Sequence, residues 1–182
     1  MVGEPKAALD VRPRRLTMKI AGLSALGVGL LGASLLQPTR PLLVWNASAS
    51  VPIGLYRIDR RAPAVGNVAL VRLGEPVANL AKRRAYLPST AFLLKPVVAW
   101  RGDRVCRLGS HILARGRHVG RALARDAVGR RLPSWRGCRT LGAEELFLFA
   151  DRPDSFDSRY FGPIGVDQVI GFATPVWPTP VN

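Results

Sequence analysis

The sequence has few residues that commonly bind metal ions. It contains two cysteines and two histidines among 182 residues, and it has neither a CxxC pair nor a Cys/His cluster. His111 and His118 lie among arginine and glycine, far from most carboxylates. Structural zinc sites need several Cys and His ligands at short spacing. We therefore expect no metal site, and nothing in the sequence indicates another cofactor.

Acidic residues are also scarce, at 12 against 27 basic residues, which gives a formal net charge of +15 and a pI of about 11.5. Such an excess attracts polyanions whatever the fold. Only four of the basic residues are lysines, and the arginines are spread from Arg12 to Arg159. No helix-turn-helix, zinc-finger or aromatic–basic pattern accompanies them. We therefore expect no nucleic-acid partner, and we interpret the charge as solvated surface with some attraction to membrane lipids.

Charge is absent from the 17 residues of Ile20–Leu36. At about 1.5 Å per residue, this length is the lower limit for crossing a hydrocarbon core. A cleavable signal peptide has a similar layout, but this run ends in Leu-Leu-Gln-Pro rather than at a small-residue cleavage site. The basic preceding segment predicts a cytoplasmic N-terminus. We predict a cytoplasmic segment (1–19), a transmembrane helix (20–36) and a periplasmic domain (37–182).

Long helical patterns are missing from the rest of the chain. Short apolar or alternating runs, separated by Gly, Pro and Asn, predict strands. These runs are Leu55–Ile58, Val68–Leu73, Ala91–Trp100, Val105–Leu108, Ile112–Ala114, Leu146–Ala150 and Val169–Ala173. One helix is predicted at Val77–Tyr86, before Pro88. Residues 116–137 show no clear periodicity and indicate a loop or irregular hairpin, so the predicted domain is mostly β.

A turn containing Ser50 follows the apolar run closely. Residues 46–56 read NASASVPIGLY, in which Pro52 and Gly54 favour a turn and Tyr56 begins a new apolar run. Such a turn can present one hydroxyl to a substrate. Considered alone, the segment is equally typical of an Ala/Ser-rich loop after a membrane anchor.

Lys95 lies within an otherwise apolar run, residues 92–100. Burial disfavours the charged form of lysine and lowers its pKa, so a buried lysine can act as a base near neutral pH. A neutral lysine can deprotonate a serine without a histidine. The alternative is a lysine on an edge strand that extends its amine to water.

A third polar stretch, residues 154–162, reads DSFDSRYFG and follows a predicted buried strand. Its carboxylates, hydroxyls, guanidinium and aromatic rings suit a rigid, hydrogen-bonded loop. The alternative is a polar turn in which Asp157 and Arg159 merely pair.

Taken together and in this order, the three stretches resemble the type I signal peptidase family of membrane-anchored Ser/Lys proteases. The motifs are SVPIGLY, LLKPVVAWRGDRVC and DSFDSRYFGPI. The Ser-x-Pro-x-Gly-x-Tyr spacing, the RAYLP segment and the positions of the two cysteines are most similar to the TraF-type subgroup, which processes pilin subunits for conjugative transfer. The resemblance implies a signal-peptidase-like coiled β-sheet or barrel domain after one N-terminal transmembrane helix.

The resemblance also implies the roles of individual residues. Ser50 would be the nucleophile and Lys95 the general base. The hydroxyl of Ser48 and the backbone N–H of Ser50 would form the oxyanion hole. Loss of one such donor typically reduces the rate by about 100- to 1,000-fold.

Three residues of the last motif would support the dyad. Ser155 would orient the Lys95 amine, and Asp157 and Arg159 would pair to hold the loop. Asp157 is also a candidate for a direct catalytic role. Two residues depart from the family pattern, Pro96 directly after the lysine and Arg101 before Gly-Asp, and both could alter how a substrate strand docks.

The implied substrate is a membrane-inserted preprotein or propilin with small residues before the cleavage site, which adds as a strand beside the active site. The implied location is a bacterial inner membrane, with the catalytic domain in the periplasm. We hypothesise a Cys106–Cys138 disulfide there because that compartment is oxidising. The alternatives are a pilin peptide cyclase that uses the same acyl-enzyme, a LexA-type self-cleaving protein, and a non-catalytic single-span scaffold.

Overall fold

The computed structural model describes residues 20, 22–29, 43–87 and 92–179. Contacts divide the chain into two units, residues 1–40 and 41–182. In the first unit, residues 20 and 22–29 are helical. None of the helices among the described residues is long and apolar enough to cross a membrane. Much of the predicted span 20–36 lies outside the described residues, so that span remains a prediction.

The second unit is mostly β, which confirms the predicted class. Its helical elements are α2 (Val77–Arg83), α3 (Ser158–Phe161) and the 3-10 turn η1 (Val166–Gln168). The strands that the structure describes are β1 (Leu43–Asn46), β2 (Ile53–Asp59), β3 (Val68–Val71), β4 (Leu93–Trp100), β5 (Arg104–Leu108), β6 (His111–Ala114), β7 (Arg117–Arg121), β8 (Gly137–Thr140), β9 (Glu145–Leu148), β10 (Ile164–Gly165) and β11 (Val169–Thr179).

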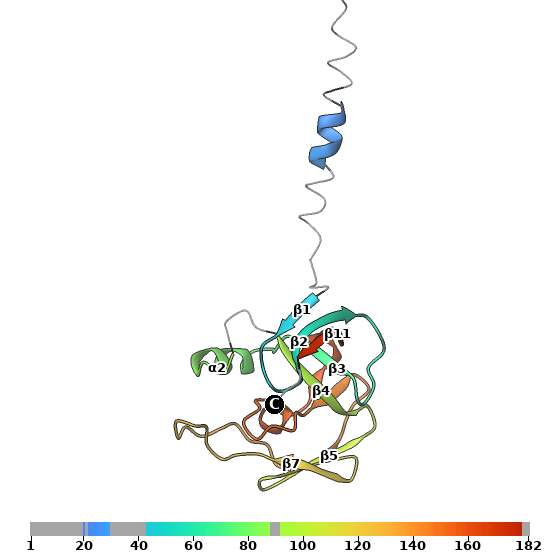
Figure 1. Ribbon diagram of the computed structural model, residues 1–182. Helices are drawn as coiled ribbons and strands as arrows, with labels where there is room; N and C mark the ends of the chain where they lie inside the picture. Colours follow the sequence, from blue (N-terminus) through green and yellow to red (C-terminus); the bar gives the residue numbers. More distant parts are fainter. Residues whose placement is uncertain (1–19, 21, 30–42, 88–91, 180–182) are drawn as a thin grey trace, which may run out of the picture. The chain divides into compact units, whose positions relative to one another are not determined.

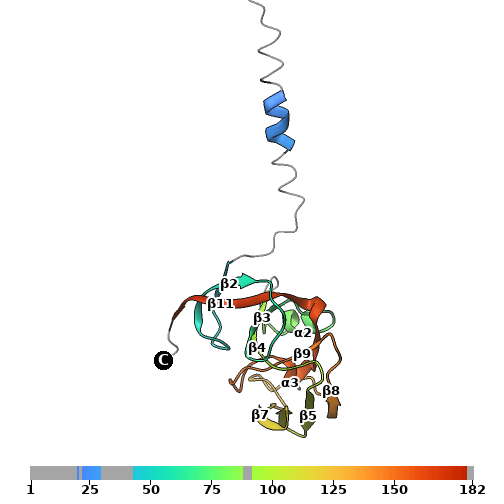
Figure 2. The same ribbon diagram turned by 90° about the vertical axis from the view of Figure 1, so that its right-hand side faces the viewer.

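The strands form two antiparallel sheets. The larger sheet has the order β1-β2-β11-β3-β4-β9-β10, and the smaller has the order β7-β6-β5-β8. Strand β11, labelled in Figure 1, is seen along its length in Figure 2, and it pairs with both β2 and β3. Register shifts in these pairings interrupt β11 at two places. Because bulges bend a strand and increase its twist, they account for the curl of the larger sheet.

The main difference from the sequence prediction concerns residues 116–137. Part of this segment forms β7, which pairs with β6 across a tight turn at Arg115 and Gly116, both with positive φ. Strand β7 escaped prediction because its side chains are largely polar and exposed. Gly120 is required there, since a Cβ atom would lie 2.5 Å from the Phe149 ring.

The structure joins Cys106 and Cys138 in a disulfide. The two residues are directly opposite each other in the β5–β8 pair, and the bond closes a segment with a sequence separation of 32. The disulfide therefore holds both ends of the segment that contains β6, β7 and the loop after them.

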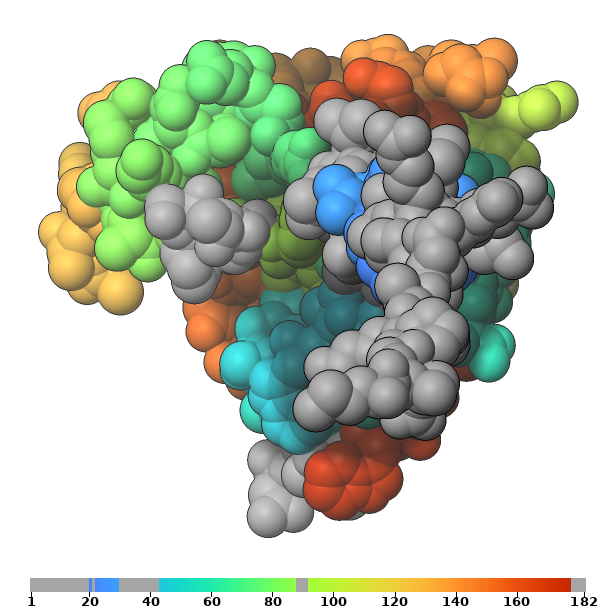
Figure 3. Space-filling view, turned by 90° about the horizontal axis from the view of Figure 1, so that it is seen from above, coloured from blue at the N-terminus to red at the C-terminus, as the bar shows by residue number. Residues whose placement is uncertain are grey.

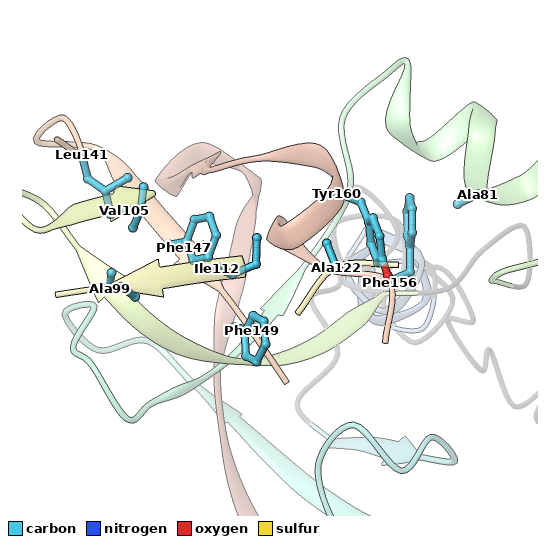
Figure 4. Close-up of a cluster of buried hydrophobic side chains, with 11 residues drawn as sticks. Ala81, Ala99, Val105, Ile112, Ala122, Leu141, Phe147, Phe149, Phe156 and Tyr160 are labelled. Atoms are coloured by element: carbon cyan, nitrogen blue, oxygen red, sulfur yellow. The ribbon is translucent and has the colours of Figure 1, made fainter. Parts of the chain in front are cut away.

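Helix α2, coloured green, and strands β1 and β2, coloured cyan to teal, lie on the same face of the domain (Figure 3). Buried side chains from both sheets and from α2 form one cluster (Figure 4). Phe147 of β9 is fully buried there and lies near Ile112 and Val105 of the smaller sheet. Phe156 and Tyr160, whose rings stack with centroids 5.8 Å apart, belong to the same cluster. This core therefore anchors the loop that follows β9.

Candidate active site

The buried side chain of Asn46 shapes the turn between β1 and β2. Its Nδ2 donates to the carbonyl oxygens of Ser48 (2.7 Å), Val51 (3.0 Å) and Pro52 (3.0 Å). Its Oδ1 accepts from the Ser48 backbone N–H (3.2 Å) and from the Ser48 hydroxyl (3.1 Å). The Asn46 amide therefore replaces the ladder hydrogen bonds that a strand would make here. Sequence reasoning did not assign this residue a role.

The second support of the turn comes from Tyr56 on β2. Its hydroxyl donates to the Pro52 carbonyl at 2.7 Å, and its ring is almost fully buried. Val51 is buried beside it in the same apolar cluster. The contacts of Asn46 and Tyr56 thus fix the backbone around Ser50. The Ser50 hydroxyl faces Lys95 on β4.

Lys95 lies in the middle of β4, opposite Ala69 of β3, and its side chain is 4% exposed. The alternative of an edge-strand lysine reaching water is excluded because β4 lies between β3 and β9. The Lys95 amine donates to the Ser50 hydroxyl and to the Ser155 hydroxyl, the latter at 2.7 Å. The two serine hydroxyls are 3.5 Å apart.

The electrostatic state of Lys95 follows from this placement. Burial lowers its pKa to about 8, and the nearby Asp157 carboxylate opposes the shift. A substantial fraction of the amine is therefore neutral just above neutral pH, and a neutral amine can accept a proton. Its contact with a serine hydroxyl is the geometry that general-base activation needs.

Asp157 and Arg159 form a fully buried ion pair in the loop after β9. Asp157 Oδ1 accepts from Arg159 Nε (2.8 Å), and Oδ2 accepts from Arg159 Nη2 (2.9 Å) and from the Ala150 N–H (3.0 Å). Arg159 also donates to the carbonyls of Ala150 and Arg121. In the described part of the chain, the Asp157 carboxylate makes no hydrogen bond to Ser50 or Lys95. Its contacts are those of a residue that holds the loop in shape.

Ser48 lies in the turn, two residues before Ser50. In this structure its hydroxyl donates to Asn46 Oδ1. To stabilise an oxyanion, the hydroxyl would rotate away from that acceptor, whereas the turn itself would stay in place through the three bonds from Asn46 Nδ2.

The two residues that depart from the family pattern lie near the dyad in sequence. Pro96 pairs with Val68 in the interior of the sheet, and its carbonyl accepts from the Phe149 N–H at 3.0 Å. Arg101 lies in the turn after β4, with its guanidinium over the Trp100 ring. Neither makes a hydrogen bond to Ser50 or Lys95 within the described residues.

A cleft of about 570 Å³ opens in front of Ser50 and Lys95. Its walls come from β1, from the segment after α2, from β4 and from the loop after β9. The cyan and green parts lie on the face shown in Figure 3. The lining residues are Val44, Trp45, Asn46, Ala47, Ser48, Ala49, Ser50, Tyr86, Leu87, Phe92, Leu93, Leu94, Lys95, Arg152, Asp154, Ser155 and Phe156. Ser50 and Lys95 thus face a largely apolar cleft. Over the residues with assigned structure, no group of three or more His, Cys, Asp or Glu could hold a metal ion.

The similarities to known proteins agree with this geometry. The family model described as "Signal peptidase, peptidase S26" matches residues 15–177. A plasmid transfer protein TraF from Escherichia coli is 32% identical over 178 residues, which cover 91% of this chain and 97% of that protein. A probable conjugal transfer protein TraF from Sinorhizobium fredii is 32% identical over 186 residues, which cover 94% of this chain and 96% of that protein.

A solved signal peptidase I from Enterococcus faecalis V583 is 18% identical, with a TM-score of 0.38, over 64% of this chain and 100% of that chain. The family match spans most of the sequence, and the two transfer proteins match along nearly their whole lengths. The resemblance stated from the motifs is thereby confirmed, and the chain belongs to the peptidase S26 signal peptidase family.

Proposed function

We propose that this chain is a membrane-anchored serine endopeptidase that removes leader peptides from exported proteins, and that its substrate is a pilin-type subunit for conjugative transfer. The observation that carries the proposal is the contact of the buried Lys95 amine with the Ser50 hydroxyl at the cleft. The family supports the type of reaction, and the printed names of the two transfer proteins support the conjugation context.

The reaction would proceed through an acyl-enzyme. An extended substrate segment with small side chains enters the cleft and adds as a strand. Ser50 Oγ attacks the scissile carbonyl carbon while Lys95 Nζ takes the hydroxyl proton. The Ser50 N–H, together with the rotated Ser48 hydroxyl, stabilises the oxyanion. Lys95 returns the proton to the leaving amine, and water then hydrolyses the ester.

Two supporting groups would keep Lys95 in place during these steps. Ser155 accepts a hydrogen bond from the amine and therefore directs it toward Ser50. The Asp157–Arg159 pair holds the loop that carries Ser155. The catalytic groups thus come from a turn, a central strand and a loop, each fixed by its own buried contacts.

The proposed location is a bacterial inner membrane, with residues 20–36 as the span and the catalytic domain in the periplasm. The disulfide supports an oxidising compartment for the domain. The apolar, uncharged sequence of residues 20–36 and the basic segment before it support the anchor and its orientation.

The proposal is tested by incubating the full chain in membranes with a pilin-type precursor and reading product masses by mass spectrometry. We expect cleavage after a small residue and a mature product with the mass of the linear fragment. A product lighter by one water would instead identify the cyclase, in which the substrate's own amino terminus resolves the acyl-enzyme. An inert wild-type protein would favour the scaffold alternative.

The pH dependence of kcat/KM should report the Lys95 amine. Its pKa is lowered to about 8, and only the neutral form accepts a proton, so the rate should rise with pH and level off above about 8. Below that value we expect a fall of about tenfold per pH unit. Initial rates measured at a fixed low substrate concentration would show this limb. A profile that is flat from about pH 6 to 8 would be inconsistent with Lys95 as the base.

Replacing Asn46 with alanine should lower kcat by about 100-fold with a much smaller change in KM, because a small misplacement of the nucleophile greatly slows chemistry. The substitution removes the three hydrogen bonds that Asn46 Nδ2 donates to the turn, but it touches neither the Ser50 hydroxyl nor Lys95. Asn46→Asp is the matched variant, since it keeps the acceptor for Ser48 and loses the donors. Steady-state kinetics, run below the melting temperature of each variant, would check this. A folded Asn46→Ala protein with wild-type kcat would contradict a positioning role.

A further inference from the structure

A second hollow lies on the smaller-sheet side of the domain, away from the residues of the proposed dyad. It has a volume of about 710 Å³ and contains four arginines, Arg107, Arg125, Arg131 and Arg136. Its other lining residues are Gly109, Ala124, Leu132, Ser134 and Trp135, so no carboxylate lines it. Much of its wall is the long loop that leaves β7, coloured yellow to orange in Figure 1.

Among the four arginines that line the hollow, Arg107 is the buried one. Its side chain comes from β5 and is 6% exposed. Its Nε donates to the Gly109 carbonyl, and one terminal nitrogen, Nη1, donates to the carbonyls of Pro133 (3.4 Å) and Arg159 (2.5 Å). The other terminal nitrogen, Nη2, makes no hydrogen bond within the described residues. A guanidinium is thus buried without a counter-charge, which is costly unless a charge of opposite sign binds it.

The remaining three arginines are exposed and add to the same positive field. Arg125 and Arg131 face each other in an isolated antiparallel bridge, which fixes their spacing. The only side-chain hydrogen bond of Arg125 among the described residues goes to the Gly129 carbonyl. Burial lowers the pKa of Arg107; Tyr160 opposes this shift, and the positive charge of the neighbouring Arg136 adds to it.

Some arginines elsewhere in the domain have a carboxylate partner. Arginines 57, 61, 115, 130, 139, 152 and 159 each lie within ion-pair distance of a carboxylate. In the part of the chain that the structure describes, none of the four arginines of the hollow has such a partner. The hollow therefore brings four guanidinium groups without a carboxylate partner together, and one of them, Arg107, is buried.

We propose that the hollow formed by these four arginines binds a phosphate group. Arginine forks match the oxygens of phosphate in pairs, and several guanidinium groups can share one phosphate because it offers more acceptor oxygens than a carboxylate. The volume also accommodates the atoms attached to a phosphodiester. A free phosphate compound and a phospholipid headgroup share this chemistry.

The hollow contacts the loop of the proposed active site through the backbone. Arg107 donates to the Arg159 carbonyl, and the Trp135 indole donates to the Ser158 carbonyl at 3.0 Å. A bound phosphate would offset positive charge beside α3. The inference of a phosphate site does not depend on peptidase activity, because it rests on the arginines alone.

Calorimetric titration of the full chain in a neutral detergent tests the proposal, with inorganic phosphate, pyrophosphate and glycerophosphoglycerol as probes. The test variant carries Arg131→Gln and Arg136→Gln, which are exposed and leave the buried Arg107 in place. The control carries Arg60→Gln and Arg117→Gln, which remove the same charge from exposed positions outside the hollow. All proteins also carry Ser50→Ala, so that binding is measured without turnover.

We expect saturable binding of at least one probe, and a loss of affinity of about tenfold or more in the test variant, with little change in the control. Tighter binding of glycerophosphoglycerol would identify a lipid headgroup as the source, and tighter binding of the inorganic anions would identify a free phosphate. Absence of saturable binding for all three probes, or equal losses in both double variants, would overturn the proposal. Neither result depends on whether the chain cleaves a precursor.

Discussion

Replacement of Lys95 by methionine is expected to reduce kcat/KM by about 10⁴-fold and, at the same time, to stabilise the protein at pH 7. Methionine fills a similar volume but cannot accept the Ser50 proton. The gain in stability arises because the native state at pH 7 holds a mostly charged amine in a buried site. Lowering its pKa from 10.5 to about 8 corresponds to a cost of about 3 kcal/mol.

The cost of burying the charged Lys95 amine depends on pH. The unfolded chain binds the Lys95 proton up to about pH 10.5, whereas the folded chain releases it near 8. The cost is therefore complete below about pH 8 and disappears as the pH rises through 10.5. The lost hydrogen bonds to Ser50 and Ser155 offset part of the gain, so we expect a net stabilisation of about 1–2 kcal/mol at pH 7.

Thermal unfolding and cleavage assays on Lys95→Met would measure both effects. Lys82→Met is the matched control, because Lys82 is exposed on α2 and should change neither quantity. A Lys95→Met protein that still cleaves would remove Lys95 from the mechanism. The gain in melting temperature should shrink as the pH rises from about 8 to 10.5. A fall in melting temperature at pH 7 would mean that the buried amine stabilises the fold.

Replacing Asp157 with asparagine should destabilise the protein by about 3 kcal/mol or more, because it leaves the Arg159 guanidinium buried without its counter-charge. Arg159 is 1% exposed and Asp157 is fully buried, so water cannot compensate for the loss. Asp154→Asn is the matched control, since its pair with Arg152 is exposed and should contribute at most about 1 kcal/mol. Urea unfolding of the two variants gives the comparison.

The same variant separates the two roles that the sequence left open for Asp157. If the residue only holds the loop, Asp157→Asn should lose stability, and activity should return toward wild type when Arg159→Met is added to remove the unpaired charge. A protein as stable as wild type but inactive would instead assign Asp157 to the chemistry. A double-mutant cycle of Asp157 and Arg159 therefore decides between the two.

The parts of the site that could be predicted are those that local sequence patterns mark. Ser50 precedes a Pro and Gly turn, and Lys95 is a single charge in an apolar run, which burial makes chemically distinctive. Strands β2 to β6, strand β9 and the first part of β11 carry apolar or alternating residues, and the sequence predicted them near their observed positions. The family resemblance supplied the order of the three motifs, and the structure brings Ser50, Lys95 and Ser155 into hydrogen-bond contact.

The features that the sequence did not predict depend on tertiary contacts, which a local sequence pattern does not reveal. Asn46 acts on carbonyls up to six residues away, and nothing in its sequence neighbourhood distinguishes it from a loop asparagine. Arg107 is one of many arginines, and only its burial and the absence of a carboxylate set it apart. Strand β7 is polar because it is largely exposed, so it lacks the alternation that identifies a half-buried strand.

The smaller sheet has a consequence for attempts to simplify the protein. It reaches the larger sheet through shared apolar packing, and also through the bonds from Arg107 and Trp135 to consecutive carbonyls of α3. We therefore expect that residues 101–141 cannot be deleted without disturbing the rest of the domain. The deletion would remove the Arg107 and Trp135 donors from α3, next to the loop that carries Ser155. The two sheets must therefore be kept together when the protein is engineered.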